Sequence, residues 1–125
     1  MNIRLSQMLT LGLVLAIAPA ARAERPATVR QEINHLIGHI GDSRCEFKRN
    51  GTWSDAKAAE AHVRVKYDFL VRLGMIDTAK DFIDKAAAAS SLSGQPYEIR
   101  CGGDLPMPTS LWLNNELARY RASQQ

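Results

Sequence analysis

The sequence predicts an α+β fold in which about four helices pack on a small antiparallel sheet. Three observations support this prediction. Apolar residues recur at helical spacing in four segments, and two shorter segments alternate apolar and polar residues as β-strands do. Each alternating segment carries one of the two cysteines of the chain, Cys45 and Cys101. A Cys45–Cys101 disulfide would therefore tie the two strands together.

The first 23 residues have the pattern of a secretory signal peptide. Arg4 supplies a positive charge, an apolar run follows at about 8–18, and the triplet at 21–23 (ARA) is a cleavage signal. The apolar run is shorter than the roughly 20 residues that span a bilayer, so we favour cleavage after Ala23 over an uncleaved membrane anchor. The sequence thus predicts an exported, periplasmic protein of one domain, residues 24–125.

The charge of the chain does not favour nucleic acid as a partner. The chain has 16 Lys and Arg against 13 Asp and Glu, but Arg4 and Arg22 leave with the predicted signal peptide, so the mature chain is close to neutral. Its sequence has no run of like charges and no basic patch interleaved with aromatic residues. We expect neither nucleic-acid binding nor stable membrane insertion of the mature protein.

Two cysteines in an exported chain favour a structural disulfide. Because bridged Cα atoms lie about 5 to 6 Å apart, pairing of Cys45 with Cys101 would place their strands side by side. The alternative is a redox-active pair, which we disfavour because the C-x-x-C spacing that lowers a thiol pKa is missing.

The first predicted helix begins after Thr28, which can cap it, and ends near Gly41. A strand with Cys45 and Phe47 on its inner face then runs into Asn50-Gly51. Asn-Gly between alternating residues is the strongest short signal for a β-hairpin, because both positions of its turn need a positive φ.

A long helix, which Ser54 or Asp55 can cap, is predicted from Asp55 to about Leu73, where Gly74 ends it. Its apolar residues cover a wide arc, which predicts that more than half of its surface is buried and that it is the central helix of the domain. The residues of this arc are Ala56, Ala58, Ala59, Val63, Val65, Tyr67, Phe69, Leu70 and Leu73.

The third predicted helix starts after Thr78, which with Asp81 resembles a capping box, and extends to Ala89. The segment 90–94 (SSLSG) ends it.

Residues 97–101 alternate and form the strand that ends in the second cysteine, and a loop rich in glycine and proline follows at 102–108. Thr109 or Ser110 is expected to cap the last helix. The inner face of that helix contains Trp112, Leu113, Leu117 and Tyr120.

Several short motifs occur together along the mature chain. They are EINHL at 32–36, RNG at 49–51, AEAHVRVK at 59–66, TA at 78–79, FIDK at 82–85 and SSLSGQPY at 90–97. As a set they resemble the YfeK-like family of small secreted bacterial proteins, a domain of unknown function. The resemblance covers nearly the whole mature chain and implies one compact periplasmic domain, with no established activity.

His62 and Lys66 form the first candidate site. They lie four residues apart within the apolar arc of the long helix, where an unpaired charge would be costly. One interpretation is structural: the histidine binds a backbone carbonyl and the lysine reaches outward. The other is a shallow pocket for a small anionic ligand or an acidic side chain of a partner. Its further residues would be Arg49, Asn50, Ser91, Ser93 and Tyr97.

The second candidate site lies on the first helix, where Glu32, His35, His39 and Asp42 share one flank. A His-x-x-x-His pair with carboxylates can chelate a transition metal. Asp42 follows Gly41, however, and His39 lies outside the family motif. We favour a solvated face, and we expect no metal and no other cofactor.

These patterns favour a non-catalytic binding or interaction module that recognises an envelope component or a protein partner. The alternative is a small periplasmic enzyme that uses the region of His62 and Lys66. A nucleophile elbow is missing from the sequence, and serines 90, 91 and 93 are expected at a helix end because their hydroxyls bond the local backbone. An enzyme needs a concave pocket with convergent polar groups, whereas a partner-binding module shows an exposed patch.

Overall fold

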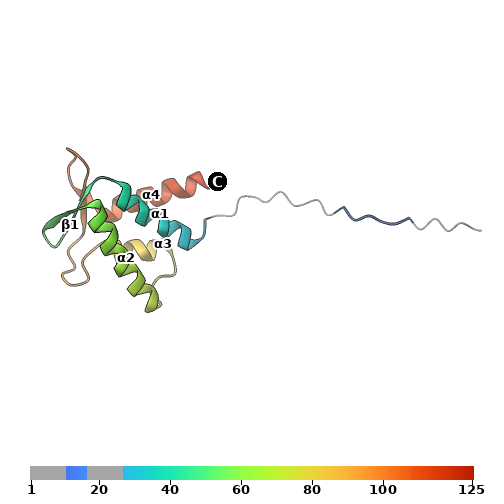
Figure 1. The fold of residues 1–125 in the computed structure, drawn as a ribbon, viewed down its shortest axis with the longest axis horizontal. Coiled ribbons are helices and arrows are strands. Elements are labelled where there is room, and N and C mark those ends of the chain that lie inside the picture. Colours follow the sequence, from blue (N-terminus) through green and yellow to red (C-terminus); the bar gives the residue numbers. More distant parts are fainter. Residues whose placement is uncertain (1–10, 17–26) are drawn as a thin grey trace, which may run out of the picture.

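The computed structural model describes residues 11–16 and 27–125, and residues 11–16 form no helix or strand. The rest of the predicted signal peptide and its cleavage site lie outside the described residues. The predicted α+β class is confirmed (Figure 1). The elements are α1 (Val29–Asp42), β1 (Glu46–Arg49), β2 (Thr52–Asp55), α2 (Ala56–Arg72), α3 (Ala79–Phe82), the π-helix η1 (Ile83–Ala87), β3 (Glu98–Arg100), β4 (Met107–Pro108) and α4 (Thr109–Ser123).

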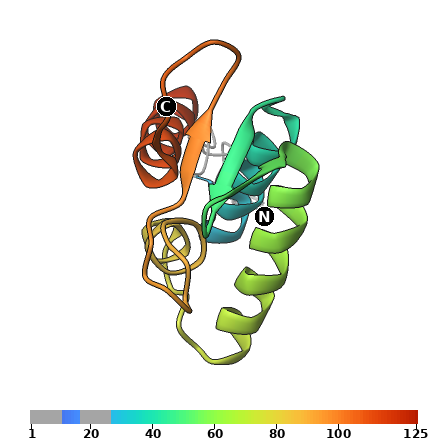
Figure 2. The same ribbon diagram turned by 90° about the vertical axis from the view of Figure 1, so that its left-hand side faces the viewer.

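The four strands form one antiparallel sheet in the order β2-β1-β3-β4. Asn50 and Gly51 connect β1 to β2 with φ angles of 50° and 82°, as the predicted hairpin turn requires. Figure 2 shows the strands of the sheet with α2 on one side and α4 on the other. Among the helices of residues 11–16 and 27–125, none is long and apolar enough to cross a membrane.

The register of β1 against β3 extends from the disulfide to the candidate site. The predicted Cys45–Cys101 disulfide is confirmed, with its Cα atoms 4.4 Å apart. The ladder then pairs Phe47 with Ile99 and Lys48 with Glu98. Continuing it by one residue places Arg49 opposite Tyr97, on the same side of the sheet as the cysteines.

The central helix is α1. Its residues Ile33, Leu36 and Ile37 are at most 1% exposed, and the helix packs against α2, α3 and α4. Figure 2 shows α1 behind the sheet, between α2 and α4. Thr28 and Gln31 form a capping box that fixes where α1 begins.

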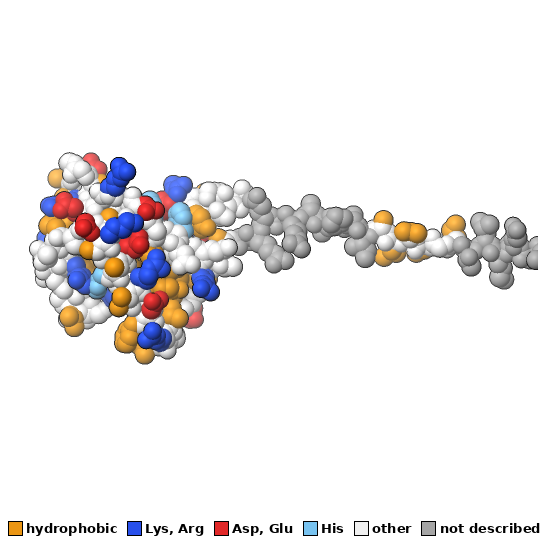
Figure 3. Space-filling model, in the orientation of Figure 1, with side chains coloured by type: hydrophobic (Ala, Val, Ile, Leu, Met, Phe, Trp, Pro, Cys, Tyr) orange, Lys and Arg blue, Asp and Glu red, His pale blue; other side chains and the backbone are white. Residues whose placement is uncertain are grey.

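The prediction that α2 is central and mostly buried is wrong. Val65 is 71% exposed, Phe69 58% and Leu73 56%. In Figure 3, hydrophobic side chains gather over the lower end of α2, which Figure 2 shows at the edge of the molecule. The apolar arc is thus divided between a face that packs inside the protein and a face that meets solvent. The buried residues of α2 are Ala56, Ala59, Val63 and Leu70.

The third helix is shorter than predicted as an α-helix. Thr78 and Asp81 form the predicted capping box, but the α-helical turns end at Phe82 and continue as η1. Ala86 and Ala87 in η1 are fully buried, and η1 packs against α2 and α4. These small side chains let the neighbouring helices approach closely.

The loop before α4 also differs from its prediction. Residues 107–108 pair with β3 as the short strand β4. Helix α4 begins directly at Thr109, and neither Thr109 nor Ser110 caps it, since Pro108 occupies the N-cap position without a side-chain hydrogen bond. The predicted cap is therefore wrong, and the hydroxyl of Thr109 does not bond to the backbone at the start of α4.

Reduction of the disulfide is expected to lower the free energy of unfolding by about 4 kcal/mol, because the link closes a long loop and restricts the unfolded chain. The two cysteines are 56 residues apart. Urea unfolding with and without a thiol reductant measures the difference. The Cys45→Ala/Cys101→Ala variant serves as the control and should match the reduced protein. Equal unfolding midpoints for the oxidised and reduced forms would contradict the expectation.

Candidate functional site

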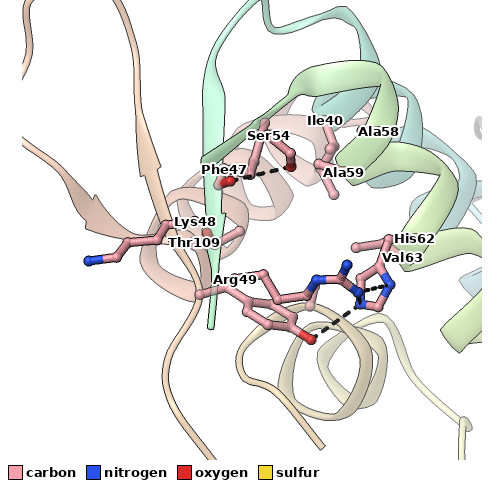
Figure 4. Close-up of a pocket in the computed structure, with 12 residues that line it drawn as sticks. Ile40, Phe47, Lys48, Arg49, Ser54, Ala58, Ala59, His62, Val63 and Thr109 are labelled. Carbon is pink, nitrogen blue, oxygen red and sulfur yellow. Dashed lines mark hydrogen bonds between the residues drawn. The ribbon is translucent and has the colours of Figure 1, made fainter. Parts of the chain in front are cut away.

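A cavity of about 90 Å³ lies between the β1–β2 hairpin, α2 and the start of α4. It has room for about three water molecules and is smaller than the cavities of about 150 Å³ that hold benzene. Figure 4 shows its lining side chains converging from these elements. The polar residues of the lining are Lys48, Arg49, Ser54, His62, Tyr97 and Thr109, and the rest are apolar.

Arg49, His62 and Tyr97 form a connected polar chain along this cavity. The Arg49 guanidinium contacts both ring nitrogens of His62, with Nη1 3.0 Å from Nε2 (Figure 4). His62 Nε2 lies 3.3 Å from the Tyr97 hydroxyl. A guanidinium can only donate hydrogen bonds, so His62 must present an unprotonated nitrogen to it. The imidazole is therefore neutral in this arrangement.

The electrostatics of the cavity agree with a neutral His62. Burial, then the charges of Arg49 and Lys66, lower the pKa of the His62 imidazole. Burial and Arg49 also lower the pKa of Lys66, whereas burial raises the pKa of the Tyr97 hydroxyl. No carboxylate is among the residues that line this cavity. The site thus carries uncompensated positive charge, which favours an anion.

Lys66 lies outside the cavity and contacts the polar chain of Arg49, His62 and Tyr97 at its Tyr97 end. Its ammonium donates to the Ala89 carbonyl at 2.7 Å and lies 3.5 Å from the Tyr97 hydroxyl. It also lies 5.2 Å from the centre of the Tyr97 ring. Lys66 therefore binds a backbone carbonyl, a role that the structural interpretation gave to His62, and it does not simply reach outward. His62 instead contacts side chains.

Thr109 is the functional candidate that the sequence did not reveal. Its side chain is 3% exposed and lines the cavity, and its backbone N–H donates to the Tyr97 carbonyl at 2.9 Å. Its hydroxyl oxygen has no hydrogen-bond partner among the described residues. A buried hydroxyl without a partner costs about 1–3 kcal/mol, so a water or a ligand atom in the cavity would stabilise it.

Three further residues of the predicted pocket lie elsewhere. The Ser93 hydroxyl donates to Asn50 Oδ1 at 2.6 Å, which ties the hairpin turn to the loop after η1. Ser91 is exposed. Of the seven predicted residues, the structure thus brings Arg49, His62 and Tyr97 to the cavity. Extending the strand register from the disulfide pairs Arg49 with Tyr97, whereas His62 comes from α2.

The candidate metal residues of α1 are divided between two clusters. His35 Nε2 lies 2.7 Å from Glu116 Oε1, and His39 Nε2 lies 3.6 Å from Glu116 Oε2. Glu32 pairs instead with Arg121, at 2.6 Å. No group of three or more His, Cys, Asp or Glu side chains within the described residues could hold a metal ion.

The two histidines pack α1 against α4. The His35 ring stacks on Tyr120 with centroids 4.0 Å apart, and His39 stacks on Trp112 at 4.4 Å. Glu116 lies buried between them. Hydrogen bonds from Arg119 and then from His35 hold the pKa of the Glu116 carboxyl at about 2. This contact is a structural junction between the first and last helices.

Comparison with known proteins gives a family and one similar protein. The profile of a family described as "Family of unknown function (DUF5329)" matches residues 27–121. "Uncharacterized protein YfeK" of Salmonella typhimurium is 36% identical over 66 residues, which cover 52% of this chain and 53% of YfeK. The match therefore spans about half the length of that relative. No solved structure matches the chain.

Glu116→Gln is expected to lower stability in a pH-dependent way. A carboxyl whose pKa is lowered by folding stabilises the fold above its unfolded-state pKa, and this effect is lost as the pH falls through the folded-state pKa. For Glu116 these pKa values are 4.5 and about 2. We expect the variant to be less stable by about 2 kcal/mol at neutral pH and equal to the wild type near the lower pKa.

Urea unfolding at a series of pH values measures this difference. Asp84→Asn is the control, because Asp84 is an exposed carboxylate in a surface pair with Lys80. It should change stability little throughout. If the loss of unfolding free energy in Glu116→Gln does not vary with pH, the lowered pKa of Glu116 is contradicted.

Proposed function

Because this chain belongs to the DUF5329 family, whose function is unknown, we propose a role from the site itself: an exported, non-catalytic module that binds a small anionic ligand. The resemblance to YfeK-like proteins is confirmed, but it assigns no activity. The ligand occupies the cavity of Arg49, His62, Tyr97 and Thr109.

The unpartnered hydroxyl of Thr109 is the observation that carries the proposal. It is nine-tenths buried and belongs to the lining of the cavity that Arg49 and Tyr97 also line. A ligand with an anionic group at Arg49 and a polar atom at Thr109 would satisfy both residues. Buried polar groups are almost always hydrogen-bonded in proteins, so an unsatisfied one in a cavity suggests an occupant.

The chemistry of the cavity favours a short carboxylic acid over a phosphate. The planar guanidinium of Arg49 matches a carboxylate in two parallel hydrogen bonds. Apolar side chains such as Val63 and Ala87 line the same cavity and suit carbon atoms. Its volume of about 90 Å³ encloses the carboxylate end of an acid of about two or three carbons, and the rest extends through the open mouth of the cavity. A hydroxyl group on that acid would form a hydrogen bond with the Thr109 hydroxyl, which otherwise lacks a partner.

Binding is favoured over catalysis because the lining offers no activated nucleophile among the described residues. The Ser54 hydroxyl donates to the Phe47 carbonyl at 3.4 Å rather than to a base. The raised pKa of Tyr97 keeps its hydroxyl protonated. Among the residues that line the cavity, His62 is the group able to accept a proton, and it already accepts a hydrogen bond from Arg49.

Export is supported by the signal-peptide pattern and by the disulfide. A disulfide persists in an oxidising compartment such as the periplasm and is rare in the cytosol. In that compartment the ligand is a small acid of the cell envelope, either free or at the end of a larger molecule or partner protein.

We expect lactate and propionate to bind, and Arg49→Gln to weaken both by about tenfold or more, because it removes a charged hydrogen-bond donor. Binding should also raise the pKa of His62, since an anion offsets the charges of Arg49 and Lys66 that lower it. NMR titration of the His62 ring, with acetate and inorganic phosphate as comparison anions, measures both effects. Thr109→Val should reduce the affinity for lactate to that for propionate.

Lys57→Gln is the matched control for charge, because Lys57 is an exposed cation of α2 that does not line the cavity. It should leave binding almost unchanged. If none of the four anions shifts the His62 resonances at millimolar concentration, or if Lys57→Gln weakens binding as much as Arg49→Gln, the proposal is wrong.

The proposed export predicts a mature protein that begins at Glu24. When the full chain is produced in a Gram-negative bacterium, mass spectrometry of the periplasmic fraction should find that N-terminus, because Ala23 ends the cleavage signal. Ala23→Lys should give an uncleaved precursor, since the site needs a small residue. Recovery of the intact wild-type chain from the cytosol would contradict the proposal.

A further inference from the structure

The outward face of α2 is apolar along the length of the helix. Ala58, Ala61, Val65, Phe69 and Leu73 are all exposed and follow one another at intervals of three or four residues, so they lie on one side of the helix. We name these five residues the outer stripe. A helix of a monomer that meets solvent normally has a polar outer face, and an apolar one marks an interface.

Charged residues of alternating sign border the outer stripe. Arg64 and Asp68 are exposed and lie along one flank, and the exposed Arg72 lies at the C-terminal end of the stripe. None of the three takes part in an ion pair within the described part of the chain. Their charges are therefore available to a partner.

We propose that the outer stripe is a homodimer interface, in which α2 packs antiparallel against α2 of a second copy. A two-fold axis makes such an interface complementary to itself. With the axis near residue 66, Asp68 of one copy lies level with Arg64 of the other, and the pair occurs twice. A lipid surface is a poorer occupant, because Asp68 borders the stripe halfway along its length and its carboxylate would be brought against the lipid.

Side-chain sizes fit the same arrangement. With the axis near residue 66, Phe69 of one copy lies level with residue 63 of the other. Its ring therefore lies between Ala61 and Val65 of that copy. The largest side chain of the stripe thus faces the gap between Ala61 and Val65, as interdigitating helices require. Val63 itself points inward and is buried, so it does not obstruct this contact.

The test is the mass of the purified protein in solution across micromolar concentrations, measured by sedimentation equilibrium. We expect a dimer for the wild type, and a monomer for Phe69→Asp, with affinity reduced by about a hundredfold. Leu92→Asp is the matched control, because Leu92 is 96% exposed and lies outside the stripe. It should remain a dimer.

A charge exchange tests the pairing itself. Asp68→Arg and Arg64→Asp should each weaken the dimer about fivefold, and the double variant should restore it, because the two opposite charges then face each other again. Thermal unfolding confirms that each variant folds. A monomeric wild type, a Phe69→Asp variant that dimerises as tightly as the wild type, or a double variant no better than either single one would overturn the proposal.

Discussion

The pairing of β1 with β3 is the contact on which the rest of the structure depends. It joins α1, the hairpin and α2 to β3 and α4, between cysteines that are 56 residues apart. The disulfide holds one end of this ladder, and the same register brings Arg49 beside Tyr97 at the other end. Because side chains alternate across a strand, both residues point to the face that α2 covers with His62. The position of the candidate cavity follows from this single register.

Local signals in the sequence were sufficient for most of the element boundaries. The capping residues Thr28, Asp55 and Thr78 and the turn Asn50-Gly51 depend on the backbone within a few residues, so they can be recognised without tertiary information. The burial of α2 could not be predicted in this way. An apolar arc shows that a surface avoids water, but it does not show whether the same chain or another molecule covers it.

The candidate site was predictable only in part, for a related reason. Arg49 and Tyr97 follow from the disulfide and the alternation of the strands. The role of Thr109 could not be predicted, because a threonine at a helix start normally caps that helix. In the structure Pro108 occupies the N-cap position instead. The contact of His39 with Trp112 was also hidden, since it depends on how α1 and α4 cross.

The pairing of Glu32 with Arg121 has a consequence for the topology of the chain. Arg121 Nε and Nη2 donate to the two oxygens of the buried Glu32 carboxylate, at 2.6 and 3.0 Å. The first turn of α1 is thereby held to the last turn of α4, and Figure 1 shows the C-terminal end beside α1. A short peptide could join these ends, so the fold is suited to circular permutation and to insertion into a surface loop of a host protein.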